Sequence, residues 1–197
     1  MKDYIFIIGP SAVGKTTLAK GLFKHYDSVY IEQNMVPEFG FKDIKTDDIG
    51  LFEEKVCCDN TLMQIDYFHK LGYKNIIALD FDDLRTREIP IVFKGTNFIT
   101  LKLISRDYKQ IERQMEYRHQ NEGGLYVPNE VEYHNNKILS RSLLPNEVLI
   151  DVNGKTREDV LKEAINIIDN YSSKLNYDYE LPDKNLFESW VKSNNLE

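Results

Sequence analysis

Runs of apolar residues alternate along this chain with segments in which apolar side chains recur at helical spacing. Such alternation is typical of a parallel sheet whose strands are connected by helices. The apolar runs predict five strands, at residues 4–8, 28–32, 75–81, 98–105 and 147–152. The helical segments lie at residues 15–26, 47–72, 107–119, 130–142 and 155–171. The order of these elements predicts an α/β fold with a five-stranded parallel sheet.

The longest predicted helix, residues 47–72, begins after the N-cap residue Asp47 and is closed by Gly72. Several of its apolar residues share one face, which predicts that this face packs into the core. These residues are Phe52, Val56, Met63, Tyr67 and Leu71. The segment 83–94 is ambiguous, because Pro90 interrupts a helix while the neighbouring apolar residues suit an extended chain.

The length of 197 residues suits a single domain, which we expect to span residues 1–170. Residues 171–197 form a polar tail that contains one short amphipathic patch. The patch consists of Leu186, Phe187 and Trp190. We expect it to dock on the body of the protein or on a second subunit, so the sequence leaves a homodimer open.

The formal net charge of −7 argues against an extended surface for nucleic acid. No apolar run is long enough to span a bilayer, and the first residues lack the features of an export signal. The cysteines Cys57 and Cys58 are adjacent in a predicted helix, which does not favour a disulfide. These features predict a cytoplasmic protein without a nucleic-acid or membrane partner.

A glycine-rich segment, GPSAVGKTT, connects the first predicted strand to its helix. Its glycines allow successive N–H groups to converge on one anion, and the positive end of the helix dipole points to the same place. In this phosphate-loop pattern Lys15 reaches the β- and γ-phosphates, and the Thr16 hydroxyl can join the shell of a Mg²⁺ ion. We therefore expect the chain to bind a nucleoside triphosphate, ATP or GTP. The expected contacts are Gly9, Pro10, Ser11, Ala12, Val13, Gly14, Lys15, Thr16 and Thr17.

A second candidate for the metal is Asp80, which ends the third apolar run. A carboxylate at the C-terminal end of a parallel strand faces the crevice in which ligands bind. We therefore expect Asp80 to hold Mg²⁺ together with Thr16. Asp82 follows closely and is the alternative.

Other users of this loop carry features that this chain lacks, because no guanine-reading motif of the switch GTPases is present and the chain is short for the larger ATPases. Over residues 4–168 the chain resembles P-loop kinases of nucleotides and small molecules, in the nucleoside monophosphate kinase-like group. The resemblance rests on the loop, on IIALD, on LISRDYKQIERQMEYRHQ and on VLIDVNGKTREDVLKEAI. It implies the P-loop NTPase fold, a three-layer α/β/α sandwich with a mobile lid at about residues 113–130.

The same resemblance implies roles for two arginines after the fourth strand. Arg113 and Arg118 resemble lid arginines that close over the transferring phosphoryl group, where a guanidinium neutralises the charge on the equatorial oxygens. The alternative is a solvated helix face on which Glu112 and Glu116 partner these arginines.

The region that builds the acceptor pocket in such kinases, here about residues 33–73, contains no arginine and is acidic and aromatic. Because a monophosphate normally requires bidentate arginines, this favours an uncharged or cationic hydroxyl acceptor, such as a nucleoside, a sugar or an amino-alcohol. Arg85 and Arg87, just after the third predicted strand, are evidence against this interpretation, because they could bind a phosphate group of the acceptor from the other side. Glu32 stands where similar small-molecule kinases keep the carboxylate that takes the hydroxyl proton, and we expect it to be the base. Asp80 or Asp82 is the alternative.

Three functions therefore follow from the sequence. The first is an ATP- and Mg²⁺-dependent kinase of a small-molecule hydroxyl. The second is a nucleoside monophosphate kinase of the guanylate kinase type, since the wording of the loop is similar, although the S-x-T-T-R stretch of those enzymes is absent. The third is a nucleotide-binding regulatory module without turnover.

Overall fold

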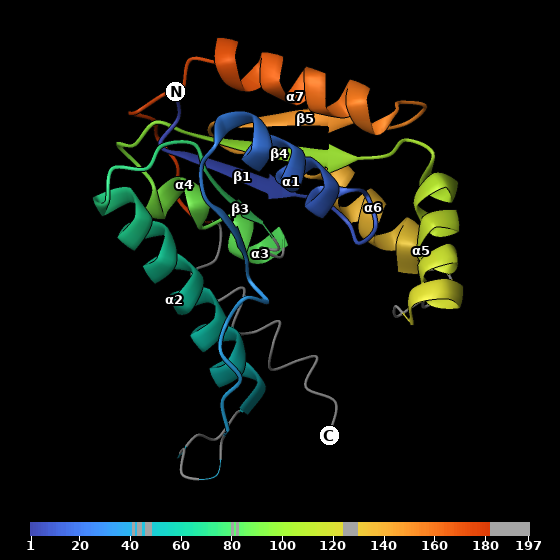
Figure 1. The fold of residues 1–197 in the computed structure, drawn as a ribbon, viewed down its shortest axis with the longest axis horizontal. Coiled ribbons are helices and arrows are strands. Elements are labelled where there is room, and N and C mark those ends of the chain that lie inside the picture. Colours follow the sequence, from blue (N-terminus) through green and yellow to red (C-terminus); the bar gives the residue numbers. More distant parts are fainter. Residues whose placement is uncertain are drawn as a thin grey trace.

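The carboxyl ends of five parallel strands form the edge of the molecule on which the phosphate loop lies. The computed structural model describes residues 1–40, 42, 45, 49–79, 81, 83–123 and 130–181. The strands are β1 (Tyr4–Ile8), β2 (Tyr30–Glu32), β3 (Ile76–Leu79), β4 (Phe98–Ile104) and β5 (Glu147–Asp151), in the spatial order β2-β3-β1-β4-β5 (Figure 1). The helices are α1 (Lys15–Tyr26), α2 (Ile49–Lys70), α3 (Asp83–Thr86), α4 (Ile89–Val92), α5 (Tyr108–Glu122), α6 (Glu130–Ser140) and α7 (Arg157–Asn170).

The central strand β1 is buried on both faces, which explains its continuous apolar sequence. Ile5 and Ile7 point into one core, which is closed by α1 and α7. Tyr4 and Phe6 point into a second core, to which α2 and α4 contribute. The sheet therefore lies between two layers of helices, and the predicted three-layer α/β/α architecture is confirmed.

The bounds of several elements follow from local chemistry. The side chain of Asp107 accepts a hydrogen bond from the backbone N–H of Lys109 and caps the start of α5. At the start of α7, Thr156 and Asp159 form a reciprocal capping box. The ambiguous segment 83–94 forms two short helices, and Pro90 lies in the first turn of α4, where its missing N–H is not needed.

The predicted apolar face of α2 is wrong over the second half of the helix, although Phe52 and Val56 in the first half are partly buried. Met63, Tyr67 and Leu71 do share a face, but they are 69%, 60% and 58% exposed. The opposite side of the helix carries the buried Cys58, Thr61 and Ile65. Thr61 is buried without penalty because its hydroxyl donates to the backbone oxygen of Cys57. Apolar residues thus lie on both sides of α2, and periodicity cannot choose between two such faces.

Part of the predicted tail packs on the body of the protein. The oxygen and the N–H of Lys174 both bond to the side chain of Asn146, just before β5. Further along, the hydroxyl of Tyr177 donates to Pro90 O and that of Tyr179 donates to Arg87 O. The predicted docking patch at Leu186, Phe187 and Trp190, and the predicted N-cap Asp47, lie outside the described residues.

Candidate functional site

The phosphate loop leaves β1 at a position that only glycine can occupy. Gly9 has a φ of +150°, and a Cβ atom there would lie 2.5 Å from Leu103 O and 2.9 Å from Val13 Cγ1. Gly14, directly before α1, has a φ of +104°, while Ala12 adopts a left-handed conformation at 61°. Such backbone conformations turn consecutive N–H groups toward one point, which is the geometry of an anion-binding concavity.

The side chain of Lys15 lies over this loop. Its Nζ donates to Gly9 O at 3.1 Å and to Pro10 O at 3.2 Å. The ammonium group is therefore held against the loop that leads into the N-terminus of α1. An incoming phosphate group would meet both the lysine and the helix N-terminus.

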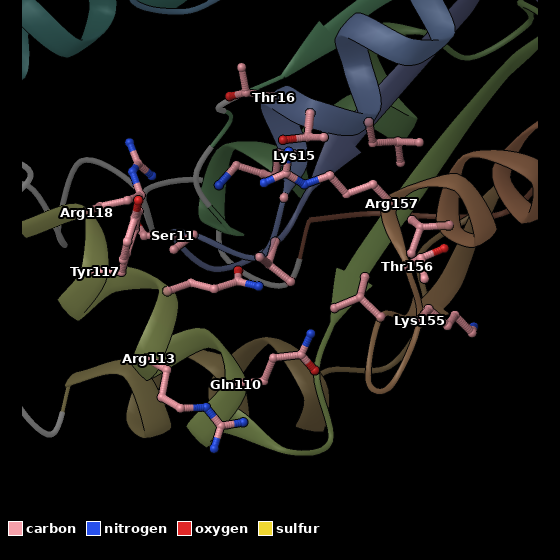
Figure 2. A pocket seen from close by; sticks show the side chains of 18 of the residues that line it. Ser11, Lys15, Thr16, Gln110, Arg113, Tyr117, Arg118, Lys155, Thr156 and Arg157 are labelled. Carbon is pink, nitrogen blue, oxygen red and sulfur yellow. The ribbon is translucent and has the colours of Figure 1, made fainter. Parts of the chain in front are cut away.

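A cavity of about 890 Å³ opens in front of the loop (Figure 2). One wall is the loop and the start of α1, a second wall is α5, and a third is the segment between β5 and α7. Of the residues predicted to bind nucleotide, those lining the cavity are Ser11, Ala12, Val13, Gly14, Lys15, Thr16 and Thr17. Gly9 and Pro10 are not among the lining residues, but their carbonyl oxygens accept hydrogen bonds from Lys15.

The wall formed by α5 is polar. It presents the side chains of Gln110, Arg113, Gln114, Tyr117 and Arg118, which recur at intervals of three and four and so share one helix face. The structure thus brings both predicted lid arginines to the same cavity as Lys15. The side chain of Arg113 is 69% exposed and lies 4.0 Å from the carboxylate of Asp107. Part of the predicted lid, residues 124–129, lies outside the described residues.

Glu32, at the end of β2, also lines this cavity. Its Oε1 atom is buried and accepts no hydrogen bond from any part of the chain that the structure describes. A buried carboxylate oxygen without a donor is unfavourable unless a ligand satisfies it. Of the described part of the predicted acceptor region 33–73, Asn34 alone reaches the cavity lining, so the acidic and aromatic pocket expected there remains a prediction.

The remaining candidates are not among the residues described as lining the cavity. Asp80 and Asp82 fall outside the described residues, so the predicted metal ligand is not placed. Arg85 forms an ion pair of 3.0 Å with Glu88, and neither it nor Arg87 lines the cavity. Among the described residues, no group of three or more His, Cys, Asp or Glu side chains is arranged to hold a metal ion.

Several lining residues were not predicted from the sequence. Gln110, Gln114 and Tyr117 could have been found by extending the helical spacing of Arg113 and Arg118. Lys155 belongs to residues 153–156, which resemble the adenine-flanking loop of the P-loop kinases. No such signal exists for Arg157, because α7 reaches the cavity only through the packing of the sheet.

No protein-family model matches the chain, and no curated protein matches it. Several solved structures do match the chain. A sugar kinase from Janibacter sp. HTCC2649 is 18% identical, with 86% of this chain and 95% of that one covered and a TM-score of 0.59. A gluconokinase from Sinorhizobium meliloti 1021 is 13% identical, with 84% and 91% covered and a TM-score of 0.57. The tunicamycin resistance protein of Deinococcus radiodurans is 14% identical, with 88% and 98% covered and a TM-score of 0.53.

At these identities the likeness establishes the fold. The chain has the α/β fold of the P-loop kinases, and the fold predicted from the phosphate loop and the strand pattern is confirmed. No helix among the described residues is both long and apolar enough to cross a membrane.

Proposed function

We propose that this chain is an ATP- and Mg²⁺-dependent kinase that phosphorylates a hydroxyl group of a small molecule. The observation that carries the proposal is the orphaned carboxylate oxygen of Glu32, which shares one cavity with Lys15 and the phosphate loop. The likeness to a sugar kinase and a gluconokinase supports the same class of acceptor.

The residues of the loop suit a triphosphate. Its N–H groups and Lys15 would hold the phosphate chain, and Thr16 would ligate Mg²⁺, with Asp80 as the proposed second ligand. When bound, Mg²⁺ would neutralise charge on the phosphates. The positive φ angles of Ala12 and Gly14, which both line the cavity, support this fit, because such a backbone turns consecutive amides toward one anion.

Glu32 would act on the acceptor. Its carboxylate would orient the acceptor hydroxyl and take its proton, while the acceptor oxygen bonds to the γ-phosphorus and the bond to the β–γ bridging oxygen breaks. Arg113 and Arg118 would neutralise the charge on the transferred group. Because they stand on an exposed wall, we expect α5 and the lid, residues 113–130, to move toward the loop when substrates bind.

The acceptor that we propose is a nucleoside, a sugar or an amino-alcohol. Besides Glu32, the cavity offers the amide side chains of Asn34, Gln110 and Gln114. Amides can donate to and accept from hydroxyl groups, so this lining suits a polyhydroxylated molecule.

The test is acceptor-dependent ATP consumption with Mg²⁺, measured over a panel of sugars, nucleosides, amino-alcohols and nucleoside monophosphates. With the acceptor found in this way, we expect Glu32→Gln to lower kcat by about 100-fold or more, the scale of a lost general base. ADP affinity, measured by calorimetry, should stay within about twofold. The matched control is Glu180→Gln, which removes an exposed carboxylate outside both the acceptor region and the cavity lining and should leave kcat unchanged.

Three outcomes would contradict the proposal. Full activity of Glu32→Gln would show that Glu32 is not the base of the reaction. Stimulation by GMP or another monophosphate alone would favour the guanylate kinase-like alternative. Silence over the whole panel, with tight nucleotide binding that Lys15→Ala weakens, would favour a regulatory module.

A further inference from the structure

The start of α7 adds a cation to the cavity beyond those of the loop and α5. Arg157 is the first residue of α7 and lines the cavity together with Lys15 and Thr17. Its side chain extends from α7 into the cavity, in the direction of Lys15 (Figure 2). It makes no hydrogen bond or ion pair with the part of the chain that the structure describes.

The residues next to Arg157 in the sequence form hydrogen bonds and ion pairs within the chain. Thr156 accepts from the backbone N–H of Asp159 at 3.1 Å, and the carboxylate of Asp159 accepts from the backbone N–H of Thr156 at 3.2 Å. Lys155 is held by Glu163 at 2.6 Å. The capping box therefore fixes the backbone of Arg157 while its guanidinium stays available to a ligand.

The packing of α7 on α1 places this arginine along the expected phosphate chain. The two helices approach closely at Gly21, where a Cβ would lie 3.0 Å from the Leu161 side chain. Both helices begin at the carboxyl edge of the same parallel sheet and run in the same direction. One turn before this contact stand Thr17 in α1 and Arg157 in α7, and both line the cavity. Arg157 is thus near the last residue of the phosphate loop motif.

The cavity lining combines apolar and polar residues. Leu18, Val152 and Val160 supply apolar surface, which suits a nucleobase, while Lys15 and Thr17 belong to the phosphate loop. Arg157 stands one turn before Val160 in α7 and shares the lining with Thr17, so it is near residues of both kinds. A cation at a helix N-terminus is opposed by the helix dipole, although Glu158 and Asp159 in the first turn offset this effect. An anion bound beside Arg157 would be favoured by the guanidinium and by the N-terminus of α7.

We propose that Arg157 binds the phosphate chain of the nucleotide at its base-side end, the α-phosphate, as a contact supplied by α7. This inference rests on the nucleotide binding in the proposed function, but not on the identity of the acceptor. It makes Arg157 a binding residue for donor and product nucleotide alike.

The test compares ADP and adenosine affinities, measured by calorimetry or by competition with a fluorescent nucleotide. Arg157→Gln should weaken ADP binding by about tenfold, the effect expected for one charge-assisted hydrogen bond. Arg157→Lys should recover most of the affinity, and adenosine affinity should not change. The control Lys162→Gln removes one positive charge from an exposed position of α7 outside the cavity lining and should leave both affinities unchanged.

Unchanged ADP affinity in Arg157→Gln would overturn the proposal. So would an equal loss for adenosine, because the arginine would then contact the base or ribose. If Lys162→Gln weakened ADP binding to the same extent, the loss would reflect the net charge of the protein and not a contact made by Arg157. A chain that binds ADP through Arg157 but phosphorylates no acceptor would support this inference while contradicting the proposed kinase function.

Discussion

Gly9 shows how a single position shapes the phosphate loop. The atoms that a side chain would meet there belong to the backbone of β4 and to Val13, so the glycine allows the loop to lie directly against the neighbouring strand. The phosphate-loop motif has a glycine at this position because the turn needs its conformational freedom. The close approach to Leu103 O adds a steric reason that comes from a strand far along the chain.

We expect Gly9→Ala to destabilise the protein by about 1–3 kcal/mol, the range for overpacking and backbone strain, and to abolish detectable ADP binding. Urea unfolding and calorimetry measure the two effects. Gly72→Ala is the control, because its φ of +94° is also positive but no atom lies within 4 Å of the added Cβ. It should cost about 1 kcal/mol and leave ADP affinity intact. Normal ADP binding by Gly9→Ala would contradict the tight packing of the loop.

At the scale of elements, α2 differs most from its sequence-based interpretation. Its spacing correctly predicts a helix and correctly groups Met63, Tyr67 and Leu71 on one face. The other face packs on the sheet through smaller or more polar residues, Cys58 and Thr61 together with Ile65. A helix with apolar residues on both sides is oriented by the shape of the sheet against which it packs, and that shape is set by residues outside the helix.

The two faces of α2 should respond differently to truncation. Ile65→Ala should lower the free energy of unfolding by about 2–5 kcal/mol, the range for a large buried aliphatic side chain. Met63→Ala should change it by no more than about 0.5 kcal/mol, because Met63 is 69% exposed. Urea unfolding measures both. An equal loss in Met63→Ala, dependent on protein concentration, would indicate that a second subunit covers this face, as the sequence leaves open.

At the scale of the whole molecule, Lys2 connects the N-terminal segment to the segment that follows α7. This lysine is 4% exposed, and its Nζ donates to Asn97 Oδ1 at 3.3 Å, to Ser173 Oγ at 2.9 Å and to Tyr171 O. Burial lowers its pKa below the usual range of a lysine. The contact holds the chain after α7 against the amino ends of the strands. It is a structural role far from the cavity.

Lys2→Met should therefore lower stability by about 1–3 kcal/mol, since it leaves buried acceptors without a donor. In hydrogen exchange, amides of residues 171–177 should lose protection more than those of β1. ADP affinity should not change. Lys20→Met, at an exposed position of α1, is the matched control and should alter neither stability nor exchange. Unchanged protection of residues 171–177 in Lys2→Met would show that this segment is held by its other contacts alone.

The sequence by itself determined the order of the strands and of the longer helices, the position of the phosphate loop and the α/β fold. These depend on local periodicity and on a short motif whose backbone chemistry is self-contained. It also placed α1 within the bounds that the structure has. Only the tertiary structure decided which face of α2 is buried and which distant side chains share the cavity. Glu32, Arg113 and Arg157 come from β2, α5 and α7, and they share one cavity with Lys15 because parallel strands bring all their carboxyl ends to one edge. The spacing of residues within one element cannot encode a distance between three elements, since that distance is set by the strand order and by how closely the helices pack.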